Sequence, residues 1–518
     1  MIDVSTLSKL RRLVQRDKMS PRFVRAAGPE NGAGWPYRQC IPAGRQGCQG
    51  FGDARYRMIV SWVWSYLAAT AGFLFAAVLL THIIRQRRPP TATIAWLLVI
   101  VLAPYVGVPL YLLLGGRKVR KLSAGKNRIT LPIAPVPAVL SETERLLLAH
   151  NVPPATSGNC LVLQHTGRDS YAALVDLIEK ATHSIYIGVF ILHPDSVGKD
   201  ILARLARRAS EGLAVRLLLD GVGSLQTHHR ALGPLVAAGG RCAFFMPVLH
   251  RPFRGRSNLR NHRKTVIADG RRVLAGGANI AAEYLGPVRY PGRWPDLTFT
   301  IEGPAVNHYV GLFRSDWHFA SGEVLDTAPP AGGQATACDA DARIQVVPSG
   351  PDVPGDPLYD VLLSMTFSAR HRLWVVTPYF VPDDALCRAL ILAVHRGVDV
   401  RILVPDRSNH RIADIAGRSY LRDIADEGGK VLFFAGGMLH AKAVLMDEEL
   451  AMIGSANIDL RSLLLNYEVG VLVFSSPHIR LLEEWIDGLM AGARSGLAQA
   501  GAVGQLEEGM ARLLAPQL

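Results

Sequence analysis

The feature that most limits the fold of this 518-residue chain is an internal duplication of alternating helices and strands. After Leu161 the sequence predicts helix, strand, helix and strand, and the same order returns from Leu358. In each copy a glycine, Gly212 or Gly397, follows the second helix, where glycine favours a helix end. Because strands that alternate with helices indicate a sheet covered by helices, we expect two α/β domains of the same design.

Both copies also carry one polar signature, H-x-K-x4-D followed by G-[GS]-A-N. Its residues are His262, Lys264, Asp269 and Asn279 in the first copy, and His440, Lys442, Asp447 and Asn457 in the second. The asparagine lies 17 residues after the histidine in both copies. One H-x-K-x4-D would be a weak signal, but two in the same register predict a duplicated catalytic site.

The spacing within the signature gives its side chains different expected positions. On a strand, residues i and i+2 project from one face, so the histidine and lysine of each copy are expected to point together. The aspartate follows its histidine by an odd offset, which turns it toward the other face. We expect Asp269 and Asp447 to fix the turn or to support the lysine, and Asp269-Gly270 is typical of a hairpin turn.

A histidine that acts on a phosphodiester needs a carboxylate on its second ring nitrogen. The second copy offers Glu468, just before the apolar run VGVLVF. The first copy offers Asp296, just before LTFTIEG, and Glu283 is a competing candidate there.

Two facing His–Lys pairs would form a complete site for phosphodiester chemistry. One neutral histidine would attack phosphorus, and the other would protonate the departing alkoxide. The two lysines, with Ser455, Asn279 and Asn457, would hold the non-bridging phosphate oxygens as charge builds. No metal or other cofactor is expected, because the sequence has no H-E-x-x-H motif, aspartate cluster or Walker loop.

Two long uncharged runs, Met58–Ile84 and Thr91–Gly116, precede the duplication. Each exceeds the ~20 residues needed to cross hydrocarbon, so we expect two transmembrane helices rather than buried helices of a soluble protein. Basic residues flank both outer ends and outnumber those of the short connection, which predicts that both termini are cytoplasmic. Pro104 and Pro109 indicate a kinked second span or a re-entrant hairpin.

The formal net charge of +14 favours anionic partners, namely nucleic acid, anionic lipid or phosphate-bearing substrates. Residues 1–57 hold eleven bases and four acids, which is half of the excess charge. This segment is expected to be a disordered tail, or an extension upstream of a true start at Met58. The six cysteines form no C-x-x-C pair, which argues against a disulfide scaffold and a zinc ribbon.

The doubled H-x-K-x4-D resembles the mark of the phospholipase D superfamily. The stretches NHRKTVIADGRRVLAGGANIAAEYLG and LHAKAVLMDEELAMIGSANIDLRSLLLNYEVG, with the run AWLLVIVLAPYVGVPLYLLLGG, are similar to its bacterial cardiolipin synthase branch. The resemblance implies an α/β fold in which two phospholipase D-like α-β-α sandwich domains, related by a pseudo-twofold axis, follow two transmembrane helices. The expected parts are residues 1–57, a basic extension; 58–116, two transmembrane helices; 117–342, the first phospholipase D-like domain with its linker; and 343–518, the second.

The resemblance also implies an activity, the condensation of two phosphatidylglycerol molecules into cardiolipin plus glycerol through a phosphatidyl-histidine. It implies that His262 is the nucleophile and His440 the acid and base. Asp296 and Glu468 would hold the two histidines. The chain departs from the family at Pro295, where arginine is usual, and this proline changes the backbone beside Asp296.

The implied location is the bacterial inner membrane, in a multi-pass arrangement with cytoplasmic catalytic domains. Phosphatidylglycerol and an anionic bilayer are the implied partners. No nucleic acid partner is expected, since a nuclease has no use for two membrane spans. Two alternatives stay open from the residues alone: a hydrolase that releases phosphatidic acid, and a phosphodiesterase or nuclease of the same superfamily.

Overall fold

The computed structural model describes residues 49–85, 90–114, 126, 128–129, 131, 139–227, 229–247, 259–325, 342–497 and 500–514. The chain divides into two compact units, Met1–Ala71 and Gly72–Leu518. Most of the expected basic extension, residues 1–48, lies outside the described residues, and so do residues 326–341, in which we expect the linker at the end of the first domain. Helix α2 (Gln49–Arg85) begins inside the segment that was expected to be disordered, so residues 49–57 are helical.

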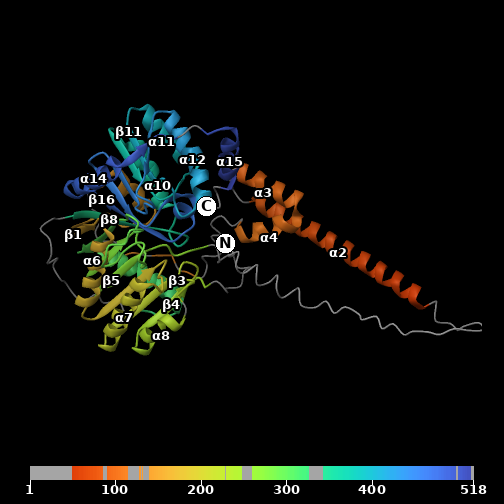
Figure 1. The fold of residues 1–518 in the computed structure, drawn as a ribbon, viewed down its shortest axis with the longest axis horizontal. Helices are drawn as coiled ribbons and strands as arrows, with labels where there is room; N and C mark the ends of the chain where they lie inside the picture. Colours follow the sequence, from red (N-terminus) through yellow and green to blue (C-terminus); the bar gives the residue numbers. More distant parts are fainter. Residues whose placement is uncertain are drawn as a thin grey trace, which may run out of the picture. The chain divides into compact units, whose positions relative to one another are not determined.

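Fifteen strands of the second unit form one mixed sheet (Figure 1). The first copy contributes β1 (Thr156–Gln164), β2 (Ser184–Val189), β3 (Ala214–Asp220), β4 (Arg241–Phe245), β5 (Thr265–Ala268), β6 (Arg272–Gly276) and β7 (Thr298–Glu302). The second copy contributes β8 (Ala342–Ser349), β9 (Arg372–Val376), β11 (Asp399–Pro405), β12 (Lys430–Phe434), β13 (Ala443–Met446), β14 (Leu450–Gly454), β16 (Glu468–Val473) and β17 (Ala493–Ser495). The short strands β10 (Phe380–Val381) and β15 (Ile458–Asp459) form a separate parallel pair.

The strand order repeats from the centre of the sheet toward both edges. The first copy runs outward as β1-β7-β6-β5-β2-β3-β4, and the second as β8-β16-β14-β13-β9-β11-β12, with β17 beyond it. Strands β1 and β8 are antiparallel neighbours at the centre. Pairing is parallel along β2-β3-β4 and β9-β11-β12 and antiparallel in the rest of the sheet. The duplication seen in the sequence is therefore a duplication of mixed α/β topology within one shared sheet.

Helices lie on both faces of this sheet. They are α6 (Gly167–Lys180), α7 (Ser196–Ser210), α8 (His229–Ala237) and α9 (Val306–Ser321) in the first copy, and α10 (Pro357–Ser368), α11 (Asp384–His395), α12 (Arg411–Asp426), α13 (Leu460–Leu464) and α14 (Ser476–Ala491) in the second, with α5 (Glu142–Ala149) before the sheet and α15 (Ala502–Leu514) after it. Along β5, Val266 joins the apolar core under α6 and α7, whereas Ile267 joins the core under α9. This alternation follows from the opposite directions of successive strand side chains. The core on the α9 side contains residues of both copies, including Trp317 and Ile486.

The glycine signals for helix ends are confirmed. Helix α7 ends at Ser210 and α11 at His395, each two residues before its glycine. Gly212 and Gly397 have φ of 96° and 84°, a left-handed conformation that glycine adopts without a steric penalty.

The second uncharged run, which was expected to be a kinked transmembrane span or a re-entrant hairpin, is not one continuous helix. It forms α3 (Pro90–Leu102) and α4 (Pro104–Leu114), which break at Ala103 because a residue before proline disfavours helical backbone. The 13 residues of α3 rise only about 20 Å, less than the ~30 Å of bilayer hydrocarbon. Within the part of the chain that the structure describes, one helix is long and apolar enough to cross a membrane, over Val60–Thr81 of α2.

Candidate active site

The first histidine lies in an extended segment just before β5 and is bound to the other copy. Asn261 forms an isolated bridge with Tyr467, and the backbone N–H of His262 donates to the Tyr467 carbonyl at 2.9 Å. We expected His262 and Lys264 within a strand, but β5 begins at Thr265. The segment is extended because it pairs with Tyr467, just before β16 of the second copy, and not with β6, the strand that pairs with β5 in the same copy.

The carboxylate on this histidine also comes from the second copy. The Nδ1 atom of His262 is 2.9 Å from Oε1 and 3.1 Å from Oε2 of Glu468, the first residue of β16. Glu468 is fully buried, and its Oε2 accepts a 2.5 Å hydrogen bond from Ser455 Oγ. Burial favours the protonated form of this carboxyl, yet His262 and Lys264 hold its pKa below the usual value. Glu468 is therefore an ionised partner that fixes the His262 ring and directs Nε2 outward as the reactive nitrogen.

The second histidine is held in the reciprocal way. The Nδ1 atom of His440 is 2.6 Å from Oδ2 of Asp296, which belongs to the first copy and precedes β7. The backbone N–H of His440 donates to the Pro295 carbonyl at 2.8 Å. The unusual Pro295 therefore takes part through its carbonyl, which proline retains, and not through the N–H that it lacks. Each histidine is thus oriented by a carboxylate of the opposite copy.

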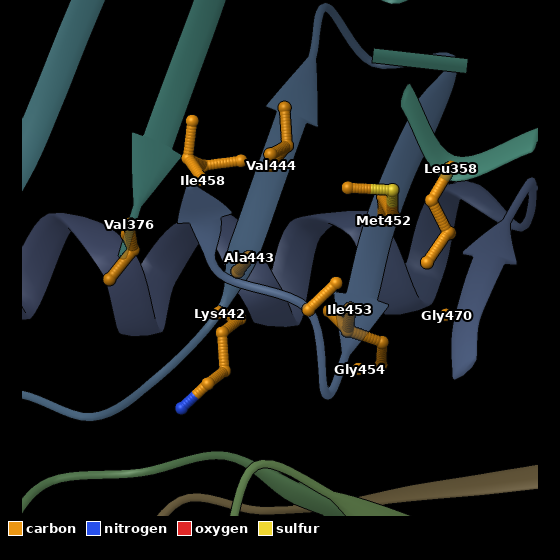
Figure 2. A pocket seen from close by; sticks show the side chains of 11 residues that line it. Leu358, Val376, Lys442, Ala443, Val444, Met452, Ile453, Gly454, Ile458 and Gly470 are labelled. Atoms are coloured by element: carbon orange, nitrogen blue, oxygen red, sulfur yellow. The ribbon is translucent and has the colours of Figure 1, made fainter. Parts of the chain in front are cut away.

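The two lysines are buried beside their histidines. Lys264 Nζ donates to the carbonyl of His262 at 2.7 Å, and Lys442 Nζ lies 2.7 Å from Nδ1 of His440. Figure 2 shows the Lys442 side chain leaving the apolar residues of β13 and β14, such as Val444, and ending beyond them. Burial lowers the pKa of Lys442 to about 8, against the opposing effect of Asp296.

Both imidazoles are neutral at neutral pH. Burial, with Lys442 as the next cause, lowers the pKa of His440 to about 3. Burial also lowers the pKa of His262, although Glu468 acts in the opposite direction. Each histidine feels the lysine of the other copy, since Lys442 lowers the pKa of His262 and Lys264 that of His440. The two His–Lys pairs therefore belong to one electrostatic site.

Aromatic rings that no sequence motif indicates cover the two histidines. Phe190, just after β2, packs edge-on against His262 with ring centroids 4.9 Å apart. Tyr284 packs edge-on against His440 at 4.9 Å, and Trp294 lies at 5.8 Å. The sequence signal that could have identified Phe190 is its position at the end of a buried strand. These rings reduce the access of water to the imidazoles.

The structure does not bring the two motif aspartates to the histidines. The Asp269 carboxylate accepts hydrogen bonds of 2.7–2.8 Å from the backbone N–H groups of residues 182–184, where β2 begins. Asp447 does the same for residues 370–372, where β9 begins, at 2.9 Å. Both residues have positive φ, 55° and 49°, in the turns that join β5 to β6 and β13 to β14. This geometry agrees with the expectation that they fix the turn.

The polar side chains that we expect to hold the phosphate oxygens lie close to the site, but each is hydrogen-bonded to another group of the protein. Ser455 Oγ donates to Glu468, Asn279 Oδ1 accepts from the Ile191 N–H at 3.1 Å, and Asn457 Nδ2 donates to Asp459 at 3.0 Å. The competing carboxylate Glu283 contributes its backbone carbonyl, which accepts from Trp294 N–H at 2.7 Å, while Asp296 occupies the position on His440. Among the described residues, no group of three or more His, Cys, Asp or Glu side chains could hold a metal ion.

A buried ionic cluster, which we call the Lys126 cluster, supports the His262 segment. It consists of Lys126, Arg263, Asp316 and Asp352. Lys126 Nζ contacts Asp316 and lies 2.5 Å from Asp352, and Arg263 Nη1 lies 2.9 Å from Asp316. Arg263 Nε also donates to the Glu468 carbonyl at 3.1 Å. The variable residue of the first H-x-K motif therefore ties the His262 segment to β16.

The chain is similar to known families over most of its length. It matches the family described as "Cardiolipin synthase, PLD-like domain" at residues 174–317 and 362–490, and "Phospholipase_D-nuclease N-terminal" at residues 74–116. Cardiolipin synthase of Geobacillus thermodenitrificans is 34% identical over 405 residues, which are 75% of this chain and 80% of that protein. Cardiolipin synthase 2 of Bacillus anthracis is 33% identical over 78% of this chain and 82% of that protein.

Among solved structures, phosphatidylserine synthase of Haemophilus influenzae has a similar fold, with a TM-score of 0.57 at 16% identity, over 73% of this chain and all of that one. The matched residues contain both His–Lys pairs and both orienting carboxylates. With a family match over more than half of its length, this chain belongs to the cardiolipin synthase family of the phospholipase D superfamily.

Proposed function

We propose that this protein is a membrane-bound phosphatidyl transferase that condenses two phosphatidylglycerol molecules into cardiolipin and glycerol. The observation that carries the proposal is the reciprocal pairing of two buried histidines with Glu468 and Asp296, each with a buried lysine beside it. Relatives that carry the name cardiolipin synthase, at 32–34% identity over most of the chain, support the reaction type.

In the first half-reaction, Nε2 of neutral His262 attacks the phosphorus of one phosphatidylglycerol. The bond from phosphorus to the glycerol headgroup oxygen breaks, and His440 delivers the proton that releases free glycerol. His440 is neutral in the resting site, but a bound phosphodiester anion favours its protonated form and raises its pKa. Lys264 and Lys442 stabilise the charge that builds on the non-bridging oxygens.

In the second half-reaction, a headgroup hydroxyl of another phosphatidylglycerol gives its proton to His440 and attacks the phosphatidyl-histidine. The bond from phosphorus to Nε2 breaks, His262 is neutral again, and cardiolipin forms. Transfer to an alcohol rather than to water requires a dry site. Phe190 and Tyr284, packed on the two imidazoles, supply part of that shield.

We infer that the catalytic part consists of two phospholipase D-like α-β-α domains, residues 117–342 and 343–518, related by a pseudo-twofold axis. The repeated strand order about the β1–β8 pair supports this arrangement. The site then lies between the domains, since each histidine uses a carboxylate of the other copy. We place the catalytic domains on the cytoplasmic side of the bacterial inner membrane, where anionic lipid attracts a protein of net charge +14.

The test is to supply purified protein with phosphatidylglycerol vesicles and to identify the products by mass spectrometry. We expect cardiolipin and glycerol in equal amounts. His262→Ala and His440→Ala should each lower the rate by ~10³-fold or more. A matched control is His395→Ala, because His395 lies at the surface and pairs with Glu427. Phosphatidic acid without cardiolipin, or an active variant at either catalytic histidine, would contradict the proposal.

A further inference from the structure

The second uncharged run folds back on itself. The rings of Trp96 in α3 and Tyr111 in α4 pack edge-on, with centroids 5.3 Å apart. These residues are 15 positions apart, which would separate them by about 22 Å in a straight helix. Figure 1 shows α3 and α4 side by side, so the chain reverses direction between them.

Two residues allow this reversal. Pro104 begins α4 and breaks the helix at Ala103. Gly107 provides the close approach, because a Cβ atom at this position would lie 2.5 Å from the Val99 carbonyl oxygen. A side chain larger than hydrogen at 107 would therefore force the two helices apart.

The hairpin packs on a short part of α2. Leu79 and Ile83, near the end of α2, share one apolar cluster with Ile100 of α3 and Tyr111 of α4. At 13 and 11 residues, α3 and α4 rise about 20 Å and 17 Å. Both are too short to cross ~30 Å of hydrocarbon but long enough to pass through one leaflet.

The turn of the hairpin is its most exposed and apolar part. Leu102 is 78% exposed and Tyr105 is 77% exposed, with Val101 and Val106 beside them. Thr91–Gly116 contains no charged residue, so this surface has the chemistry of a lipid contact and not of a water-exposed loop. The bilayer is the occupant that fits it.

Charge at the ends of the hairpin points in the same direction. Three bases precede α3 and four follow α4: Arg85, Arg87, Arg88, Arg117, Lys118, Arg120 and Lys121. If the run crossed the membrane, one of these groups would face the outer side, against the preference of bases near membrane spans for the cytoplasm. If the run returns, the two segments that carry these seven bases lie on one side of the membrane, against four bases in residues 38–57, which lead into the apolar part of α2 and lie within the ~20 residues that count toward orientation.

We propose that α3 and α4 form a re-entrant hairpin that enters one leaflet from the catalytic side and returns to it, so that the chain crosses the membrane once, through α2. This goes beyond the proposed reaction, which needs only attachment to the bilayer. It also replaces the expectation that both termini lie on one side, because a single crossing leaves the chain before α2 and the chain after α4 on opposite sides.

The reversal is tested by cross-linking in the full-length, membrane-embedded protein. Trp96→Cys with Tyr111→Cys should be joined by a short bis-maleimide, after a monofunctional maleimide has shown that both cysteines react. The matched control is Val60→Cys with Phe75→Cys, which has the same sequence separation along α2 and should not be joined. Equal cross-linking of the two pairs, or none in the hairpin pair, would overturn the reversal.

The topology is tested with Arg87→Cys and Lys118→Cys, labelled by an impermeant maleimide in inside-out and right-side-out vesicles. Peptide mass spectrometry reads the label at each introduced cysteine, so the native cysteines remain. We expect both positions to label from the same side, and native Cys40 from the opposite side. Labelling of positions 87 and 118 from opposite sides would overturn the proposal, and so would labelling of Cys40 from the same side as both.

Discussion

At the residue scale, the two copies differ at the position that contacts the carboxylate orienting a histidine. The second residue of G-[GS]-A-N is Gly277 in the first copy and Ser455 in the second. A Cβ at Gly277 would lie 2.2 Å from Asp296 Oδ1, whereas the hydroxyl of Ser455 donates to Glu468. The first copy therefore needs the space at this position, and the second needs the donor.

Exchange of these two residues should have unequal effects. Ser455→Gly removes one hydrogen bond to a charged group, and we expect kcat to fall by ~10-fold to 10²-fold. Gly277→Ser displaces Asp296 from His440, and we expect a loss of ~10³-fold or more because the imidazole loses its orienting partner. Steady-state cardiolipin synthesis by both variants measures the difference, and equal losses would contradict it.

Removal of the Glu468 charge should change the pH dependence of the reaction. Glu468 raises the pKa of His262, so Glu468→Gln should lower that pKa and keep the imidazole neutral to more acidic pH. We expect the acid limb of kcat/KM to move to lower pH while the maximal rate falls. Glu427→Gln, at the surface, is the control and should leave the limb in place. A limb that stays unchanged or moves upward in Glu468→Gln would contradict this role.

At the scale of elements, the motif aspartates act as caps of β2 and β9. Asp269→Asn leaves one acceptor oxygen for three backbone N–H donors and introduces an amide donor against them. We expect the free energy of unfolding to fall by about 1–3 kcal/mol, with kcat per folded molecule changed by less than ~10-fold. Thermal unfolding measures the change in stability, and the lipid assay measures the change in kcat, so together they separate the two effects. A kcat loss as large as that of His262→Ala, without a change in Tm, would make Asp269 part of the chemistry.

The sequence predicted the elements that depend on local patterns and missed those that depend on distant contacts. The ends of α7 and α11 followed from Gly212 and Gly397, since a left-handed glycine is a local signal. For the second uncharged run, the sequence left a kinked span and a re-entrant hairpin open, because apolar composition is the same in both. The proline break was visible, but the reversal depends on the contact of Gly107 with Val99.

At the scale of the whole molecule, neither copy contains a complete site. The sequence identified all four central side chains, His262, His440, Asp296 and Glu468, but not which histidine each carboxylate serves. That exchange depends on the β1–β8 pairing and on the bridge from Asn261 to Tyr467, which join segments about 200 residues apart. Such contacts leave no periodic trace in one sequence.

The Lys126 cluster connects the chain just after the membrane hairpin to both copies. Its four charges cancel: Lys126 and Arg263 are balanced by Asp316 and Asp352. Without Lys126 the cluster would hold one uncompensated negative charge behind the His262–Glu468 pair. A unit charge ~10 Å away in an effective dielectric of ~20 contributes on the order of 1.7 kcal/mol, or about one pKa unit.

Lys126→Met should therefore raise the pKa of His262, which also faces Glu468, Lys264 and Lys442, and move the acid limb of kcat/KM to higher pH. Lys126→Met combined with Asp352→Asn restores neutrality while it removes further hydrogen bonds. If charge balance is what the cluster contributes, the double variant should regain the wild-type limb although it is no more stable than the single variant. Lys180→Met, an exposed lysine paired with Asp176, is the control and should leave the limb unchanged. If the acid limb of the double variant stays at the pH of the single variant, the cluster contributes packing and not charge balance. Hydrogen bonds alone predict no recovery when a second charged group is removed.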